Sequence, residues 1–483
     1  MIASFLCFVA AFTAIGLASA WKSRKTKQDY YLASHSIQPW LVGLSAVATN
    51  NSGYMFIGVI GYTYVTGLAA IWLMLGWIAG DLIGSLIVHR HLRDEAGRSG
   101  EASFIGVINR WAGARGRHWQ VLVAVVAFVF LLAYAGAQLV AGSKALHVLL
   151  GWPTWLGAVI GAAMVALYCM AGGIRASIWT DAAQSVVMIV AMALLLVSSV
   201  ISLGGYSALV AEMVAIDGFL DLFPGDLLVP GLAGGVVFGL AWLFAGLSVI
   251  GQPHIMVRFM TLSDSGKMAR ARLWYYLWFI AFYAMATGVG MISRVFLADP
   301  GGFDAELALP LMALDLFPPV LVGLVLAGIF AATMSTADSL LLSASSALTH
   351  DILPQRIEKP WVLKVATLSL TALALAWALF NQQSVFSLVI MAWSGLASTF
   401  APLLLVLVCG ARPGVRLMIL MSLAGLGTAL LWRWLGWHGA VYEGMPGILV
   451  GLAVFAIGRL CRAASAGQVE RREQDGHHQL EHQ

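Results

Sequence analysis

The sequence predicts an all-α integral membrane protein with about thirteen membrane-spanning helices. Hydrophobic residues make up 60% of its 483 residues and charged residues only 10%, whereas a soluble protein carries about 25% charged residues. The mean hydropathy is +0.87. Apolar runs recur along the whole chain with short connections between them, so lipid is the main solvent of the folded chain. The 27 basic residues are scattered rather than gathered on one face, and nothing indicates nucleic-acid binding.

Thirteen stretches are apolar over roughly the 20 residues that a helix needs to cross a bilayer. They are residues 2–20, 38–60, 66–88, 120–145, 152–172, 177–203, 229–254, 273–296, 318–348, 362–381, 384–409, 415–434 and 445–460. The first lacks a basic start and is followed by Lys22, Arg24 and Lys25, which favours a membrane helix over a signal peptide. We predict one transmembrane domain over residues 1–462. Residues 463–483 are polar and charged, and we expect them to form a disordered cytoplasmic tail.

Basic connections alternate with acidic ones along the chain, which predicts an orientation by the positive-inside rule. The basic connections carry Lys22 to Lys27 after the first span, Arg90 to Arg117 after the third, Arg258 to Arg272 after the seventh, Arg356 and Lys359 after the ninth, and Arg412 and Arg416 after the eleventh. The acidic ones carry Glu212, Asp217, Asp221 and Asp226, and then Asp299, Asp304, Glu306 and Asp315. The alternation predicts an N-terminus outside the cell and a C-terminus in the cytoplasm.

The second span contains a polar run in its middle, from Thr49 to Gly53. These five residues are poor helix formers. An unwound segment at this depth would leave backbone groups that lipid cannot satisfy, which is tolerated where the segment lines a cavity or binds a ligand. The alternative is an unbroken helix whose small and amide side chains pack against a neighbouring helix.

The ninth span carries a stripe of oxygen-bearing side chains. Ser335, Asp338 and Ser339 share one helix face, which Ser343 and Ser346 extend. Hydroxyl and carboxylate oxygens are hard ligands that suit Na⁺ or H⁺ better than a soft metal. The alternative is that the hydroxyls bond back to the helix itself and that Asp338 is an interfacial acid.

Three further polar positions lie in or beside spans. Asp181 begins the sixth span on one face with Gln184 and Ser185, as part of a site or as an acid stabilised by the helix dipole. Asp81 lies in the third span, where a structural pair with a neighbouring helix is one interpretation. Pro253 ends the seventh span with a kink, and we expect His254 to be a packed, hydrogen-bonded residue near the cytoplasmic rim.

Four stretches together resemble the sodium/solute symporter family, and most closely its sodium/proline symporter branch. They are Leu44-Ser45-Ala46 through Ser52-Gly53, Gly172-Gly173 through Trp179-Thr180-Asp181, Gly251-Gln252-Pro253-His254 with Arg258-Phe259-Met260, and Ala331-Ala332-Thr333-Met334-Ser335-Thr336. The resemblance implies a leucine-transporter-like fold with a five-plus-five inverted repeat, over about residues 38–203 and 229–409. It also implies that solute and ions bind midway between the two repeats.

The resemblance implies three groups of site residues by position. The main Na⁺ site would comprise Ala48, Asn51, Ala332, Ser335 and Thr336. A second ion site, present in some relatives, would comprise Asp181, Asp338 and Ser339 together with Ser335. Solute contacts would come from Asn50, Ser52, Gly53, Tyr134, Ala245, Val249, Gln252 and Pro253.

Three positions depart from the pattern of the proline branch. Asn50 stands where that branch has a carboxylate important for sodium, and Ala245 and Val249 stand where it has aromatic residues lining the proline pocket. Asp338 is an acid where relatives have a small or hydroxyl residue. One hypothesis is that Asp338, together with Asp181, supplies the negative charge that Asn50 cannot.

We therefore expect a secondary active transporter of a bacterial inner membrane, with the lipid bilayer and a small-molecule solute as its partners. It would import a small polar solute, an amino acid in the first instance, with Na⁺ as the coupling ion. The alternatives are proton coupling through Asp338 and a transporter-like receptor that binds solute without accumulating it. The sequence contains none of the nucleotide-binding or hydrolase motifs that a pump or an enzyme would need.

Overall fold

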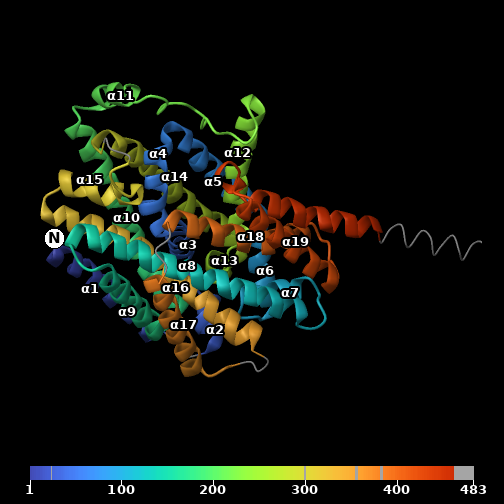
Figure 1. The fold of residues 1–483 in the computed structure, drawn as a ribbon. Coiled ribbons are helices and arrows are strands. Elements are labelled where there is room, and N and C mark those ends of the chain that lie inside the picture. Colours follow the sequence, from blue (N-terminus) through green and yellow to red (C-terminus); the bar gives the residue numbers. More distant parts are fainter. Residues whose placement is uncertain (23, 25, 298–300, 354–356, 381–383, 462–483) are drawn as a thin grey trace, which may run out of the picture.

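The computed structural model describes residues 1–22, 24, 26–297, 301–353, 357–380 and 384–461. Within these residues the chain is helical, and no β-strand is present beyond an isolated bridge between Ile37 and Leu262. The expected tail at 463–483 lies outside the described residues. Figure 1 shows the helices packed as one bundle, with the N-terminus at its edge.

The helices run in the following order (Figure 1). They are α1 (Ile2–Ala18), α2 (Lys27–Leu32), α3 (Pro39–Tyr54), α4 (Ile60–Thr66), α5 (Ile71–Gly84), α6 (Arg90–Ser99), α7 (Phe104–Trp111), α8 (His118–Leu150), α9 (Thr154–Gly172), α10 (Ile174–Ser202), α11 (Tyr206–Val214), α12 (Gly231–Leu247), α13 (Pro253–Met260), α14 (Met268–Phe296), α15 (Ala308–Leu316), α16 (Pro319–Ser346), α17 (Pro360–Phe380), α18 (Val385–Val408) and α19 (Val415–Trp434). A last helix covers Gly444–Cys461.

Every predicted span falls on a helix, but the number of spans depends on how the run Pro39–Ser99 and the short helix Ile2–Ala18 are counted. By length and composition, eleven helices of the described part could cross a membrane. One of these is the continuous helical run Pro39–Ser99, which contains the second and third predicted spans; the chain turns between them at Gly67, with φ 68° and ψ −141°. The helix Ile2–Ala18 is shorter than the others.

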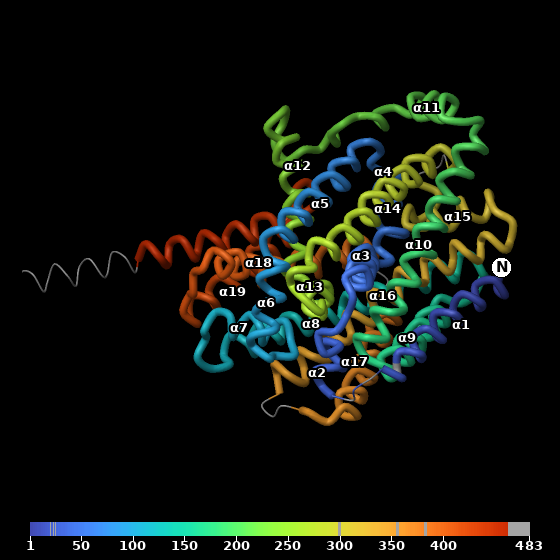
Figure 2. Tube along the Cα trace, turned by 180° about the vertical axis from the view of Figure 1, so that it is seen from behind, coloured from blue at the N-terminus to red at the C-terminus, as the bar shows by residue number. Residues whose placement is uncertain are grey.

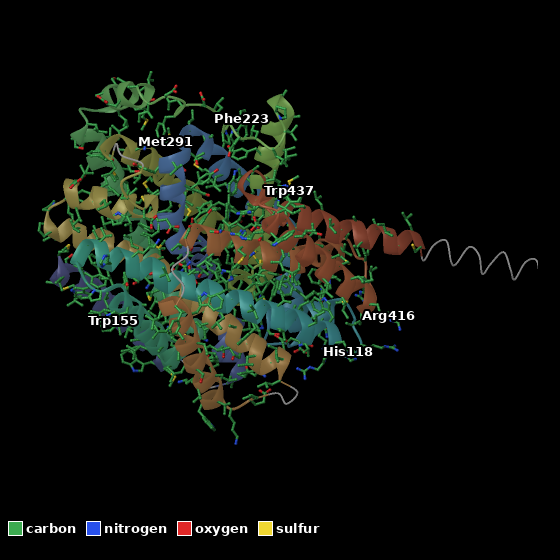
Figure 3. All side chains as sticks on the ribbon, viewed as in Figure 1. His118, Trp155, Phe223, Met291, Arg416 and Trp437 are labelled. Atoms are coloured by element: carbon green, nitrogen blue, oxygen red, sulfur yellow. The ribbon has the colours of Figure 1, made fainter. Side chains whose placement is uncertain are left out.

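Several connections that were expected to be loops are short helices. Parts of the basic stretch 90–117 form α6 and α7, and the beginning of the connection between the sixth and seventh spans, including Glu212, forms α11. The segment after α11 lies over the start of α5. There the ring of Phe223, labelled in Figure 3, stacks on Trp72 at 5.3 Å, and the Trp72 indole donates to the carbonyl of Leu222 at 2.9 Å. These helices escape prediction because they are too short or too polar to resemble spans.

The helix contacts confirm the predicted inverted repeat. The first repeat comprises α3 with α4, α5, α8, α9 and α10, and the second comprises α12 with α13, α14, α16, α17 and α18. Contacts in one repeat have equivalents in the other. The second helix of each repeat packs on the first helix of the other repeat, α5 on α12 and α14 on α3. The fifth helix of each repeat packs on the first helix of its own repeat, α10 on α3 and α18 on the end of α12. The two third helices, α8 and α16, pack on each other (Figures 1 and 2). The first helices of both repeats therefore lie at the centre.

Glycines allow α5 and α12 to approach closely. A Cβ atom on Gly80 would lie 1.9 Å from the carbonyl oxygen of Leu243, and one on Gly246 would lie 2.1 Å from the carbonyl oxygen of Trp77. Both distances are shorter than any non-bonded contact, so each site requires glycine. Close approach of backbones through small residues is the usual basis of helix association in lipid.

We expect Gly80→Ala to destabilise the protein by about 1–3 kcal/mol, because the added methyl group forces two backbones apart. The measurement is thermal unfolding of the purified protein in detergent. Gly427→Ala is the matched control, since Gly427 is an exposed helical position where an added Cβ meets no atom within 4 Å. Equal melting temperatures for the two variants would contradict this account of the α5–α12 contact.

Candidate solute and cation sites

The polar run in α3 breaks the helix, as predicted. Ser52 has φ 43° and ψ −179°, while the residues on both sides remain helical. Two side chains of α8 hold the break. The amide N–H of Gly53 donates to Gln138 Oε1 at 2.9 Å, and the Tyr134 hydroxyl donates to Ser52 Oγ at 3.4 Å. The Ser52 hydroxyl oxygen also accepts from the amide of Tyr54 at 3.1 Å.

A second break separates α12 from α13. A tight helical turn over Ser248–Gly251 ends at Gln252, which has φ −97° and ψ 99°, and Pro253 then begins α13. The Gln252 amide nitrogen donates to the carbonyls of Ser248 at 3.1 Å and Trp393 at 2.9 Å. The predicted kink at Pro253 is therefore a complete interruption, fastened to α18.

The two breaks are joined through aromatic rings. The Tyr134 ring meets the His254 ring edge-on at 5.5 Å, and His254 lies 6.4 Å from the ring of Trp393. His254 is fully buried, and neither of its ring nitrogens has a hydrogen-bond partner among the described residues. The expectation of a packed histidine is therefore confirmed, whereas the expected hydrogen bond is not found among the described residues.

Several buried polar side-chain atoms near these two breaks have no hydrogen-bond partner among the residues that the structure describes. Gln138 Nε2, Gln252 Oε1 and the Tyr54 hydroxyl are buried and, like the nitrogens of His254, lack partners within the described part of the chain. Buried polar atoms are normally paired, so such a set marks a place for a ligand. None of these side chains is Lys, Arg, Asp or Glu.

The predicted pocket wall on α12 is backed by a tryptophan. Ala245 and Val249 are both fully buried. The indole N–H of Trp393 donates to the carbonyl of Ala245 at 2.8 Å, and the Trp393 ring lies 5.2 Å from that of Trp77. An aromatic ring of α18 therefore packs beside Ala245, which no local pattern around Ala245 could show.

Oxygen atoms of α3 and α16 converge beside the first break. The Ser335 hydroxyl donates to the carbonyls of Ala48 at 3.3 Å and Ala332 at 3.1 Å, while the Thr336 hydroxyl donates to the carbonyl of Thr49 at 2.9 Å. Ala48, Ala332, Ser335 and Thr336 thus meet as the resemblance implied. The side chain of Asn51, the fifth residue of that set, bonds to the carbonyl of Val47 at 2.7 Å.

The predicted second ion position contains a guanidinium group. Arg258 Nη2 lies 3.2 Å from Asp181 Oδ2 and 3.7 Å from Asp338 Oδ1. It also donates to the hydroxyl oxygens of Ser177 and Ser339. Arg258 is fully buried, so its assignment to a cytoplasmic connection is wrong. Asp181, Asp338 and Ser339 do come together as predicted, but they surround a side chain that sequence reasoning placed elsewhere.

The chain matches known transporters over nearly its whole length. The model of the sodium:solute symporter family matches residues 30–412. The sodium/proline symporter of Escherichia coli (strain K12) is 30% identical over 500 residues, covering 99% of this chain and 97% of that protein. The high-affinity proline transporter PutP of Bacillus subtilis (strain 168) is 30% identical over 460 residues, covering 92% and 95%. The chain belongs to the sodium:solute symporter family.

Solved structures agree on the fold. A Na⁺-coupled sialic acid symporter in a substrate-bound outward-open state superposes with a TM-score of 0.77 at 17% identity, covering 94% of this chain and 96% of that one. Mhp1, a nucleobase-cation-symport-1 family transporter, superposes with a TM-score of 0.58 at 15% identity, covering 90% and 95%. This sodium:solute symporter family member is therefore a multi-pass membrane transporter and not an enzyme.

In this symporter family member the Asn50 amide nitrogen is bonded within the protein, whereas its buried Oδ1 atom has no hydrogen-bond partner among the described residues. Its amide nitrogen donates to Asp81 Oδ2 at 3.0 Å and to the Tyr275 hydroxyl oxygen. The hydroxyls of Tyr275 and Tyr276 donate to the same carboxyl group at 2.8 and 2.6 Å. The carboxylate beside Asn50 is therefore Asp81 on α5, which confirms the structural pair expected for Asp81. Asp338 Oδ1 lies 3.7 Å from Arg258 Nη2 and not beside Asn50, and the hypothesis that Asp338 and Asp181 supply the charge that Asn50 cannot stays a prediction.

We expect Asn50→Asp to destabilise the protein, because it places two carboxyl groups in contact without a cation between them. The exchange Asn50→Asp/Asp81→Asn restores one carboxyl and one amide group to the pair. In a double-mutant cycle of thermal stabilities the two positions should be coupled by about 0.5–3 kcal/mol. Additive effects of the two single changes would show that the contact does not matter.

Proposed function

We propose that the protein imports a small zwitterionic solute, of the amino-acid class, together with Na⁺ by alternating access. The main observation that supports the proposal is that the Ser335 hydroxyl meets the carbonyls of Ala48 and Ala332. These neutral, hard oxygens fit a monovalent cation. The carbonyl of Ala48 lies on α3, the helix that breaks at Ser52, while Ala332 and Ser335 lie on α16. We further propose an N-terminus outside the cell and a bacterial inner-membrane location.

The coupling follows from where the two ligands would bind. A cation held by Ala48 on α3 and Ser335 on α16 would fix the crossing of these helices. That crossing lies one turn from Ser52 and Gly53, the residues that expose backbone groups to the solute. Ordering by one ligand would favour binding of the other, and such a coupling free energy is typically about 1–3 kcal/mol.

The solute class follows from the polar atoms around the breaks. The free groups of Gln138, Gln252, Tyr54 and His254 are amides, a hydroxyl and imidazole nitrogens, none of which carries a full charge of its own to pair with a net charge on the ligand. A zwitterion suits them because its carboxylate and its ammonium group can be met by donors and acceptors respectively. The rings of Tyr134, His254 and Trp393 supply the apolar boundary.

The deciding experiment is solute uptake into proteoliposomes that carry the purified protein. We expect accumulation with an inward Na⁺ gradient and none with K⁺ in its place. Accumulation driven by a pH gradient in the absence of Na⁺ would instead favour proton coupling. Solute binding without accumulation would identify a receptor.

We expect Ser335→Ala to lower the apparent Na⁺ affinity of uptake markedly, because it removes one of the few oxygens at the cation position. The apparent solute affinity should fall only through the coupling between the sites. Ser343→Ala, about two turns further along α16, is the matched control and should leave the Na⁺ dependence as in the wild type. An unchanged Na⁺ dependence in Ser335→Ala would rule out this cation site.

We expect proline to bind weakly compared with the best amino acid in a thermal-shift screen performed in Na⁺ and in K⁺. Ala245 and Val249 lack the side-chain rings that line the proline pocket of the branch that the chain resembles, and loss of stacked rings weakens binding. The relatives named as proline transporters make proline the reference compound of the screen. Transport of proline at micromolar concentration would refute the expectation.

A further inference from the structure

Arg258 is a charged side chain enclosed in the centre of the protein. It extends from α13, just after the second helix break, toward α10 and α16. Its exposed fraction is 0%, as is that of Asp181, and that of Asp338 is 1%. A guanidinium group stays charged at any physiological pH. A permanent cation therefore resides where two membrane helices bring their carboxyl groups together.

The contacts of Arg258 are those that a bound cation would make. One nitrogen, Nη2, faces oxygens of both carboxyl groups and of the two hydroxyls of Ser177 and Ser339. The Ser45 hydroxyl donates to Asp181 Oδ2 at 2.6 Å, and the Ser177 hydroxyl donates to Asp338 Oδ1 at 2.9 Å. Two buried carboxyl groups thus share one guanidinium group, and both hold it in place.

We propose that Arg258 is a tethered internal cation that occupies the position between Asp181 and Asp338, so that the protein binds one Na⁺ and not two. The inference rests on the proposed Na⁺ coupling, which it deepens by assigning the number of ions. A second Na⁺ would have to displace the guanidinium from both carboxyl groups or lie against its positive charge.

The cluster also adjoins the proposed Na⁺ position. The Ser339 hydroxyl, which accepts from Arg258, donates to the carbonyl of Ser335 at 2.5 Å and lies 3.2 Å from the Thr49 hydroxyl. A single hydroxyl group therefore separates the guanidinium of Arg258 from the carbonyl of Ser335, whose own hydroxyl belongs to the proposed first site. Arg258 is a positioning residue for the two carboxyl groups.

The test is equilibrium binding of radioactive Na⁺ to the purified protein, which needs no knowledge of the solute. We expect one site per chain in the wild type and one in Arg258→Lys, which keeps the positive charge. Arg258→Gln removes the charge and leaves both carboxyl groups, so a second site should be gained. A purely structural role for Arg258 would not produce a change in the number of sites. Arg272→Gln is the matched control, because Arg272 donates to Ser85 and not to the acidic pair.

Two bound Na⁺ ions per wild-type chain would overturn the inference while leaving Na⁺ coupling intact. A single site in a folded Arg258→Gln protein would overturn it as well. If Arg258→Gln does not fold, the number of Na⁺ ions bound per wild-type chain still tests the inference, and Asp338→Asn is the second variant. Asp338→Asn should keep one site if Arg258 fills the position, whereas a drop from two sites to one would assign Asp338 as a Na⁺ ligand. No Na⁺ binding at all to the wild type would overturn the proposed function, and this inference with it.

Discussion

Two interrupted helices at the centre of a lipid-embedded bundle impose the main constraint on this structure. A helix that breaks in lipid leaves amide and carbonyl groups that only protein or ligand can satisfy. Here α8 covers the break at Ser52 with Tyr134 and Gln138, and α18 covers the break at Gln252 through Trp393. The third helix of the first repeat therefore supports the broken first helix of that repeat, and the fifth helix of the second repeat supports the broken first helix of its own. Polar atoms without partners in the described part of the chain lie beside these breaks.

The features that could be predicted from sequence were those with local causes. The run Thr49–Gly53 is a poor helix former wherever it is placed, and Pro253 cannot continue a helix, so both breaks could be located. The spans were also predictable because length and apolarity decide them. The short helices between spans were missed because neither property marks them.

The features that were missed depend on partners distant in sequence. Arg258 follows an apolar span and resembles a residue of a basic connection, yet its burial depends on Asp181, 77 residues earlier in the chain. Asn50 looked like the loss of a carboxylate, but Asp81 on the next helix supplies one to the same place. In both cases the sequence contained the charges, and only the packing of α5, α10, α13 and α16 showed which of them meet.

The same packing connects the charge cluster with the residues around the proposed Na⁺ position. The Ser339 hydroxyl faces Arg258 on one side and the Ser335 carbonyl and the Thr49 side chain on the other. Four helices, α3, α10, α13 and α16, therefore share one buried polar network. Because buried polar groups are costly when unpaired, α3 and α13 cannot shift against α10 and α16 unless the network exchanges partners as a unit. A network of this kind favours a few discrete arrangements over continuous sliding, which is the behaviour that alternating access requires.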